Sequence, residues 1–164
     1  MGFIEGLKTL FSGAGIALLG GVITAALGGV GSIQGVSKVG KTGMGVLAED
    51  PNLFGKVLIL QALPATNGIY GLLVWFMVML QAGFFNGSYT DISILQGVLM
   101  FVGCVPSMIV FYPGAVKQGE VSSAGCELLL KRPGEQAKAL VLTAMIETYA
   151  IFALLISVLV ILYV

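Results

Sequence analysis

Four long apolar stretches dominate the chain, and the short segments between them carry nearly all of its charge. They run from about Leu10 to Val36, Val57 to Leu80, Ile92 to Val116 and Ala139 to Val164. Each stretch is long enough for a helix to cross the hydrocarbon core of a bilayer, which is about 30 Å thick. None alternates polar and apolar residues as the strands of a membrane barrel do. The pattern predicts an all-α membrane protein with four transmembrane helices.

Two prolines are expected to mark tight turns between these helices. Pro51 separates the first stretch from the second, and Pro133 separates the third from the fourth. Proline ends one helix and begins the next because it lacks the backbone N–H but has a helical φ. Residues 37–49 and 117–131 contain no strong helix breaker other than glycine, so we expect helices to continue through them. The result is two antiparallel helical hairpins.

The two hairpins resemble each other in sequence and indicate an internal duplication. Gly43 and Gly125 each precede their proline by eight residues, and similar small and aromatic positions follow both prolines. The register slips by three residues further on, so the repeat is imperfect. We divide the chain into a first hairpin, residues 1–83, and a second hairpin, residues 84–164, as expected for a repeat of helical units.

The basic residues predict how the hairpins are oriented in the membrane. Seven of the eight lie in or beside the two proline-containing connections, whereas the connection at residues 83–91 has none. By the positive-inside rule, the connections near Pro51 and Pro133 are cytoplasmic and both termini lie outside a cell membrane that the chain crosses several times. The first stretch is too long for a signal-peptide core, so we expect the N-terminus to be mature.

Small residues recur every four positions in the first and third stretches. This spacing puts them on one face of a helix, where a neighbouring backbone can approach closely. Ordinary packing within the chain explains such a face, but its repetition on two helices favours the crowded inner wall of a ring of identical subunits. The positions are Ala17, Gly21, Ala25 and Gly29, then Thr24, Gly28 and Ser32, then Gly103 and Ser107, and finally Ala115, Gly119 and Ser123.

The composition excludes several functions. The chain is 57% hydrophobic and 10% charged, against about 25% charged in soluble domains. Its formal net charge of zero gives no basic surface for nucleic acid. The absence of histidine excludes a serine–histidine triad and a histidine-bound metal. No GxxxxGK[ST] nucleotide motif occurs, so the chain is not expected to be catalytic alone. Cys104 and Cys126 are expected to be packing residues.

One acidic residue lies deep inside an apolar stretch. Glu147 is surrounded by the apolar residues of the fourth predicted helix, whereas the other seven acidic residues lie at ends or in connections. A charged residue at the centre of a membrane helix costs about 2.5–3.5 kcal/mol on insertion scales. A carboxyl group in this position is therefore a candidate functional site.

Helical geometry predicts that other polar side chains lie at the same depth as this carboxyl group. Glu147 lies 14 residues after Pro133 and Gln118 lies 15 residues before it, so both should lie about 21–22 Å from the turn on antiparallel helices. In the first hairpin, Thr66, Asn67 and Gln34 fall at a similar distance from their own turn.

The predicted layer is rich in oxygen and contains no soft ligand, which suits a hard cation. Pro64 removes a helical hydrogen bond and is expected to free a carbonyl near Leu60 and to loosen the turn at Leu63. Tyr70 shares a helix face with Thr66 and Asn67, so its hydroxyl could bond to the carboxylate. Aligning the hairpins puts Gly68 opposite Glu147, which leaves one acidic site per four helices.

Two other functions fit four helices and one membrane carboxylate. A small proton-coupled multidrug-type transporter is the main alternative, although such proteins are shorter, carry the glutamate in their first helix and lack a duplicated hairpin. A structural ring or pore without ion coupling is the other, with Glu147 as a packing group.

The chain resembles the duplicated proteolipid, or c-ring, subunit of V-type ATPases, which is called subunit K in bacterial enzymes. The resemblance covers essentially the whole chain and is most specific in residues 60–71 and 145–151. Within the family, it is most similar to bacterial sodium-type members. It implies a membrane rotor ring that transports Na⁺, or alternatively H⁺, during rotation.

The resemblance also implies a role for individual residues. The ion-carrying carboxylate of the family matches Glu147. The Na⁺ ligands of sodium-type members match the Leu63 carbonyl, the Thr66 hydroxyl and the amides of Asn67 and Gln118. The tyrosine that locks the site matches Tyr70. The sodium-type members carry Gln where this chain has Asn67, which is one methylene shorter.

The expected partners follow from the same resemblance. They are identical subunits in the ring, a stator subunit that supplies an arginine, a central-stalk subunit and lipid, with no nucleic acid. A glutamate that holds Na⁺ or a proton is close to neutral and can pass lipid, whereas an ionised glutamate cannot. Unloading would then require water and the arginine of the stator.

Overall fold

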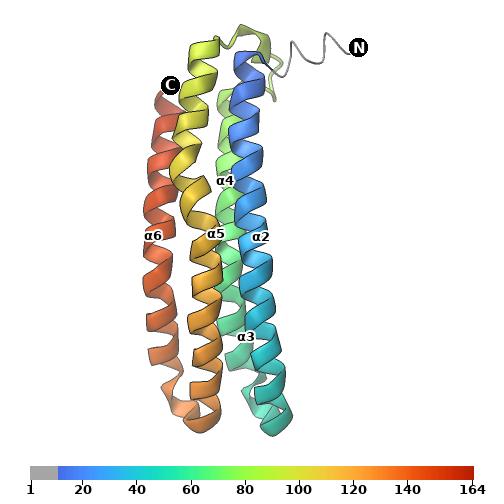
Figure 1. Cartoon of the computed structure of the whole chain (residues 1–164), viewed down its shortest axis with the longest axis vertical. Helices are drawn as coiled ribbons and strands as arrows, with labels where there is room; N and C mark the ends of the chain where they lie inside the picture. The colour runs from blue at the N-terminus through green and yellow to red at the C-terminus, as the bar shows by residue number, and fades with distance from the viewer. Residues whose placement is uncertain (1–10) are drawn as a thin grey trace.

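The computed structural model describes residues 11–164, and Leu10, where the first predicted span begins, lies outside that range. The described part is built from four long helical rods, and it contains no β-strand. Figure 1 shows the rods running side by side along one axis. Their elements are α2 (Gly13–Glu49), then η1 (Pro51–Leu53), α3 (Phe54–Ala62), η2 (Leu63–Ala65) and α4 (Thr66–Gln81), then η3 (Tyr89–Asp91) and α5 (Ile94–Lys131), and finally η4 (Pro133–Glu135) and α6 (Gln136–Tyr163).

The rods end where the sequence predicts. Asp50 is extended, and its side chain accepts a hydrogen bond of 3.0 Å from the backbone N–H of Asn52, which caps the short helix that begins at Pro51. Pro133 likewise begins η4, without a side-chain cap at Arg132. Ser93 and Gln96 form a reciprocal capping box at the start of α5. Residues 37–49 and 117–131 are helical, so the predicted extensions beyond the apolar cores are confirmed.

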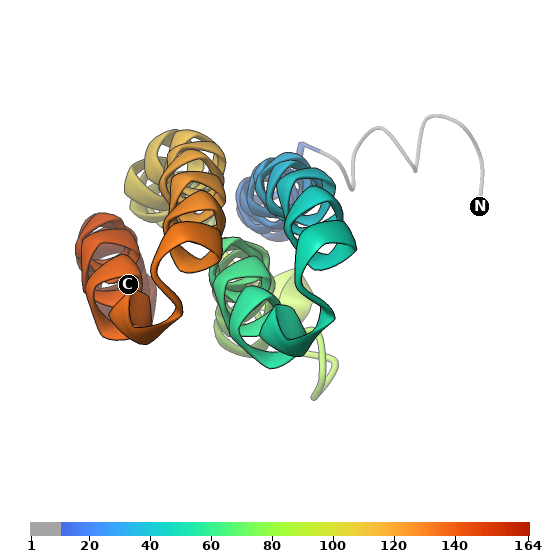
Figure 2. The same cartoon turned by 90° about the horizontal axis from the view of Figure 1, so that it is seen from below.

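The four rods form two rows. Viewed along the axis, α2 and α5 lie side by side, and the second row contains the α3–α4 rod and α6 (Figure 2). All four rods are long and apolar enough to cross a membrane, as predicted. The split into residues 1–83 and 84–164 stays a prediction, although the link between α4 and α5 falls at that point.

Glycine allows α2 and α5 to lie against each other. A Cβ atom added to Gly119 on α5 would lie only 2.5 Å from the Cα atom of Gly35 on α2, so a larger residue requires the backbones to separate. The predicted stripe of Thr24, Gly28 and Ser32 is buried within the chain. Gly29 faces open space, so the stripe of Ala17, Gly21, Ala25 and Gly29 is only partly covered by this chain.

Two apolar clusters fill the interior, and a polar layer separates them along the rods. The upper cluster includes the buried Val74, Phe111 and Ala153, and the lower cluster includes Leu60 and Leu129. Large apolar side chains also cover the outer surface, as expected for a surface in contact with lipid. The helix segments between the two clusters contain Asn67, Gln118 and Glu147.

Candidate ion-binding site

A local change of helix type positions the oxygen atoms that the first hairpin contributes to the polar layer. Pro64 lies in a single 3-10 turn, Leu63–Ala65, that interrupts the rod between α3 and α4. Proline cannot donate the helical hydrogen bond, so the ladder is broken at this level. The Thr66 hydroxyl donates a hydrogen bond of 2.8 Å to the Leu63 carbonyl. The predicted loosening at Leu63 is therefore a 3-10 turn that brings two oxygen atoms together.

The Glu147 carboxylate accepts hydrogen bonds from two other rods. The Tyr70 hydroxyl of α4 donates to Oε1 over 2.6 Å. The Gln118 side-chain amide of α5 donates to Oε2 over 3.5 Å. Glu147 is half-buried at the level where α4, α5 and α6 meet. The first bond is short, as expected for a hydroxyl that donates to a charged oxygen.

A second amide extends this network into the interior. Asn67 donates from Nδ2 to the Gln118 Oε1 atom over 3.1 Å, and both residues are fully buried. The Asn67 Oδ1 atom has no hydrogen-bond partner in the described part of the chain. An unsatisfied buried acceptor costs about 1–3 kcal/mol. A cation or a water molecule can supply the partner that this oxygen atom lacks.

Gly114, which was not among the predicted site residues, shapes this part of the layer. A Cβ atom added to Gly114 would lie 3.3 Å from the unpaired Asn67 oxygen, so the glycine leaves room beside it. Gly114 precedes Gln118 by four residues and therefore lies on nearly the same helix face. That spacing could have identified it, but glycine is too common in this chain to single it out.

Of the predicted polar layer, the structure brings Tyr70, Asn67, Gln118 and Glu147 into one hydrogen-bonded network, and Thr66 is bonded to Leu63 beside it. Gln34 is not part of the network. It lies on the exposed surface of α2 and accepts a hydrogen bond of 3.2 Å from Tyr112. The prediction concerned only its depth, and the adjacent Gly35 does lie beside Pro64 and Gly119, but depth does not specify the helix face.

No basic side chain of the described residues neutralises Glu147. The ion pairs within residues 11–164 join Lys38 and Lys117 to Glu120, and Lys138 to Glu135. A carboxylate in an apolar layer without a cationic partner is costly. Neutralisation by an ion or a proton from outside the chain removes this cost.

The position in the first hairpin that corresponds to the Glu147 site is occupied by polar groups that bond to each other. Gly68 lies at the position equivalent to Glu147, and its backbone N–H donates to the Ser32 hydroxyl over 2.8 Å. Ser32 in turn donates to the Pro64 carbonyl over 2.8 Å. These polar groups satisfy each other without a carboxylate. At the level of Gly68, the described part of the first hairpin therefore has no acidic group with which to hold an ion.

Four membrane rods in two hairpins, with one carboxylate held by donors from two other rods, define an ion-translocating component of the membrane. The family model of the ATP synthase C-subunit matches residues 13–78 and, a second time, residues 101–160. The V-type sodium ATPase subunit K of Enterococcus hirae is 33% identical over 156 residues, which cover 95% of this chain and 96% of that protein. The A-type ATP synthase subunit K of Methanocaldococcus jannaschii is 31% identical over 144 residues, which cover 88% of this chain and 60% of that protein.

The chain therefore belongs to the ATP synthase C-subunit family. Because the family model matches once in each hairpin, the predicted duplication is confirmed, and the chain is a duplicated V-type proteolipid. Members of this family assemble into rings with the other subunits of the ATPase, and the chain is a rotor-ring subunit in the membrane. The alternative of a small multidrug-type transporter is not favoured.

Proposed function

We propose that this chain, as a unit of the rotor ring, carries Na⁺ on Glu147 during rotation. The Leu63 carbonyl, the Thr66 hydroxyl and the side-chain oxygens of Asn67 and Gln118 would complete the ligand set. Oxygen ligands suit a hard cation of this kind. The observation that carries the proposal is the fully buried Asn67 oxygen without a partner, in a network that ends on a carboxylate without a basic neighbour within residues 11–164.

Tyr70 has the role of a lock in this proposal. Its hydroxyl donates to Glu147 over 2.6 Å and so favours the ionised carboxylate that a cation needs. A proton is the alternative cargo, in which case the amides and hydroxyls form a hydrogen-bond network around a neutral glutamate. The name of the Enterococcus hirae relative, a sodium ATPase subunit, supports Na⁺.

Carbodiimide labelling of Glu147 in the detergent-solubilised ring tests the cargo, because the reagent modifies a protonated carboxyl group in an apolar site. A Na⁺ site predicts that Na⁺ slows labelling and that the protection strengthens as the pH rises. Labelling that depends on pH but ignores Na⁺ would establish a proton ring instead. A Glu127→Gln variant, which removes an exposed carboxylate, is the control for labelling elsewhere.

The role of Glu147 itself is tested separately by a Glu147→Gln variant. The ring should still assemble because glutamine preserves the size and polarity of the side chain. ATP-driven ion uptake into vesicles should stop because the amide cannot become a negative ligand. Uptake that continues at the normal rate would rule out a carrier role for this residue.

The proposed orientation puts the connections at Pro51 and Pro133 in the cytoplasm and both termini outside. The distribution of basic residues supports it. Single cysteines at Gly134 and Asn86, both exposed, provide a test in intact cells. A membrane-impermeant maleimide should label position 86 and spare position 134, and the reverse pattern would invert the topology.

The partners in the proposed mechanism are identical copies in the ring, a stator subunit and a central-stalk subunit. An arginine of the stator would draw the ion from Glu147, because a nearby positive charge stabilises the empty carboxylate. Glu147 has no basic partner within residues 11–164, which supports the proposal that another subunit supplies the positive charge. In this proposal, lipid covers the outer row of helices of each copy whenever that copy is not in contact with the stator.

A further inference from the structure

The chain contains three asparagines in three different structural settings. Two of them precede a glycine, as the pair Asn86–Gly87 in the connection between α4 and α5 and the pair Asn67–Gly68 in α4. The third, Asn52, precedes a leucine. A glycine after asparagine favours attack of the glycine backbone nitrogen on the asparagine side-chain carbonyl, because no Cβ atom hinders the approach.

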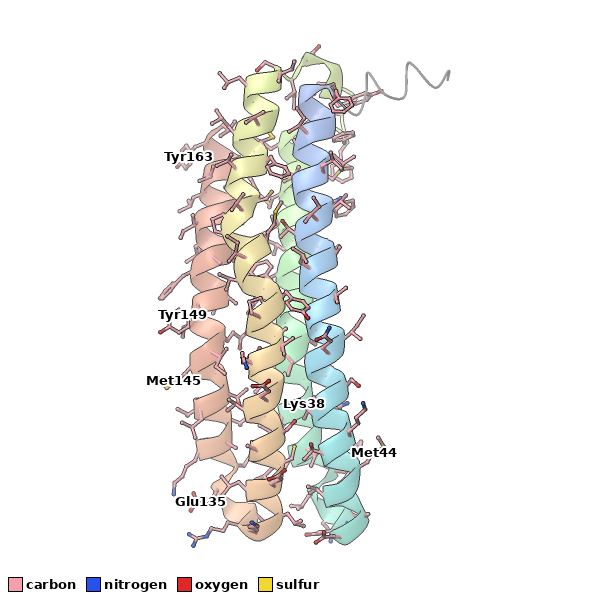
Figure 3. The ribbon with its side chains drawn as sticks, in the orientation of Figure 1. Lys38, Met44, Glu135, Met145, Tyr149 and Tyr163 are labelled. Atoms are coloured by element: carbon pink, nitrogen blue, oxygen red, sulfur yellow. The ribbon has the colours of Figure 1, made fainter. Side chains whose placement is uncertain are left out.

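The Asn86–Gly87 pair is accessible to water and to this reaction. Both residues are exposed, in the connection that Figure 3 shows at the same end of the rods as Tyr163. The Gly87 N–H donates no hydrogen bond within residues 11–164, so its nitrogen is free to react. Gly87 has a φ of 79°, and a Cβ atom added to it would meet nothing within 4 Å, so its backbone is neither helical nor enclosed.

Ser88 positions and polarises the carbonyl group that would be attacked. Its hydroxyl donates to the Asn86 Oδ1 atom over 2.7 Å, and its backbone N–H donates to the same atom over 3.4 Å. Donors directed at an oxygen atom on which negative charge develops stabilise that charge in the transition state. Three consecutive residues of the connection therefore provide an electrophile, a free nucleophile and an activating donor.

We propose that Asn86 is a site of spontaneous deamidation. The Gly87 nitrogen forms a bond to the Asn86 Cγ atom and loses its proton, while the bond from Cγ to the side-chain nitrogen breaks and ammonia is released. Water then opens the cyclic succinimide at either carbonyl and leaves aspartate or isoaspartate at this position. The net reaction consumes water, releases ammonia and involves no oxidation.

The same dipeptide inside α4 is protected by the fold. The Gly68 N–H donates to the Ser32 hydroxyl over 2.8 Å, so this nucleophile is engaged. The helix also fixes the backbone at Asn67 and opposes the rotation about the Cα–C bond that ring closure requires. Both Asn67 and Glu147 bond to Gln118, so deamidation here would put a second acidic group into the ion-binding network. The Ser32 hydrogen bond therefore preserves the chemistry of the site.

Conversion of Asn86 changes the connection and leaves the ion-binding network intact. Aspartate adds a negative charge to an exposed segment that already contains Asp91. Isoaspartate directs the backbone through the former side chain and lengthens the turn that the Ser88 N–H closes on the Gly83 carbonyl over 3.1 Å. An aged ring would thus differ from a new one in the charge of one rim. The proposal does not depend on which ion the ring transports.

Peptide mass spectrometry of the detergent-solubilised ring, stored for weeks at physiological temperature and mildly alkaline pH, tests this proposal. The Asn86 peptide should gain the mass that replacing NH₂ by OH adds, and chromatography should separate its aspartate and isoaspartate forms. The peptides of Asn67, a helical asparagine–glycine pair, and Asn52, an exposed asparagine without glycine, are the controls and should remain unchanged. Equal conversion at all three positions, or none at Asn86, would overturn the proposal.

Two variants and an unfolded control test the route. Gly87→Ala puts a Cβ atom beside the nucleophile and opposes the φ of 79°, so conversion of Asn86 should slow several-fold. Ser88→Ala removes the hydroxyl that donates to Oδ1 and should slow conversion to a smaller extent. Unchanged rates in both variants would overturn the proposed route. In denaturant, Asn67 should convert as fast as Asn86 because the helix and the bond to Ser32 are lost, and an intact Asn67 there would refute protection by the fold.

Discussion

Replacing Tyr70 with phenylalanine removes one hydrogen bond from the Glu147 carboxylate and leaves most of the packing in place. The hydroxyl donates to Oε1 over 2.6 Å. The ring packs near Phe111, with 6.1 Å between the two centroids, and that contact survives the substitution. The variant therefore isolates the hydroxyl from the aromatic ring.

The expected magnitude follows from the difference between charged and neutral acceptors. A hydrogen bond to a charged group contributes about 1.5–3 kcal/mol, whereas a neutral one contributes about 0.5–1.5 kcal/mol. The Tyr70 hydroxyl thus favours the ionised, Na⁺-holding carboxylate over the protonated one by roughly 1–1.5 kcal/mol. Because about 1.4 kcal/mol corresponds to tenfold, the Na⁺ concentration for half-protection of Glu147 should rise about five- to tenfold.

Carbodiimide labelling at fixed pH over a series of Na⁺ concentrations measures this value directly. Tyr149→Phe is the matched control, because Tyr149 is the equivalent tyrosine of the second hairpin and has no carboxylate at its hydroxyl in the described chain. The control should retain the half-protection value of the unmodified ring. A change of less than twofold in Tyr70→Phe would refute the argument that this hydroxyl sets the balance between Na⁺ and H⁺.

Three further variants test the remaining parts of the argument. Asn67→Gln should lower the Na⁺ concentration for half-protection in the same assay, because the longer side chain extends its oxygen toward the carboxylate. An unchanged or higher value would remove Asn67 from the ligand set. Gly119→Ala should destabilise the protein by about 1–3 kcal/mol through overpacking, measured as a lower unfolding temperature in detergent, whereas Gly45→Ala at an open position should not. Ser107→Ala breaks a buried hydrogen bond of 2.8 Å to Ser157 and should cost about 1 kcal/mol in the same measurement.

Most of the fold could be predicted because the membrane leaves few choices. Long apolar segments must be helical, since lipid offers no hydrogen-bond partners to an exposed backbone. Prolines at positions 51 and 133 then determined the turns, and both turns lie where they were expected. The packing of α2 on α5 was harder to predict, because a stripe of small residues does not specify its partner. Gly35 and Gly119 form the contact, whereas Gly29 faces open space.

The depth of the candidate site in the membrane was predictable from the sequence, but its hydrogen-bond partners were not. Counting residues from each turn correctly brought Glu147, Gln118 and Asn67 to one level, because helical rise is constant. Counting gives depth and not the helix face, and Gln34 lies on a face of α2 that is outside the network. The hydrogen bonds of Ser32 around Gly68 could not be predicted either, because they depend on a serine reaching across to a neighbouring rod that is interrupted at Pro64.

The lack of a carboxylate opposite Glu147 in the first hairpin has an energetic consequence for a rotor of this kind. A ring with one carboxylate per four helices moves half as many charges per turn as a ring of the same helices with a carboxylate in every hairpin. Each charge moved against 100 mV requires about 2.3 kcal/mol. For the same energy supplied per turn, the sparser ring can therefore drive each ion against twice the potential. Gly68 and Ser32 suit such a ring because their hydrogen bonds satisfy the polar groups of the first hairpin at this level without a buried charge.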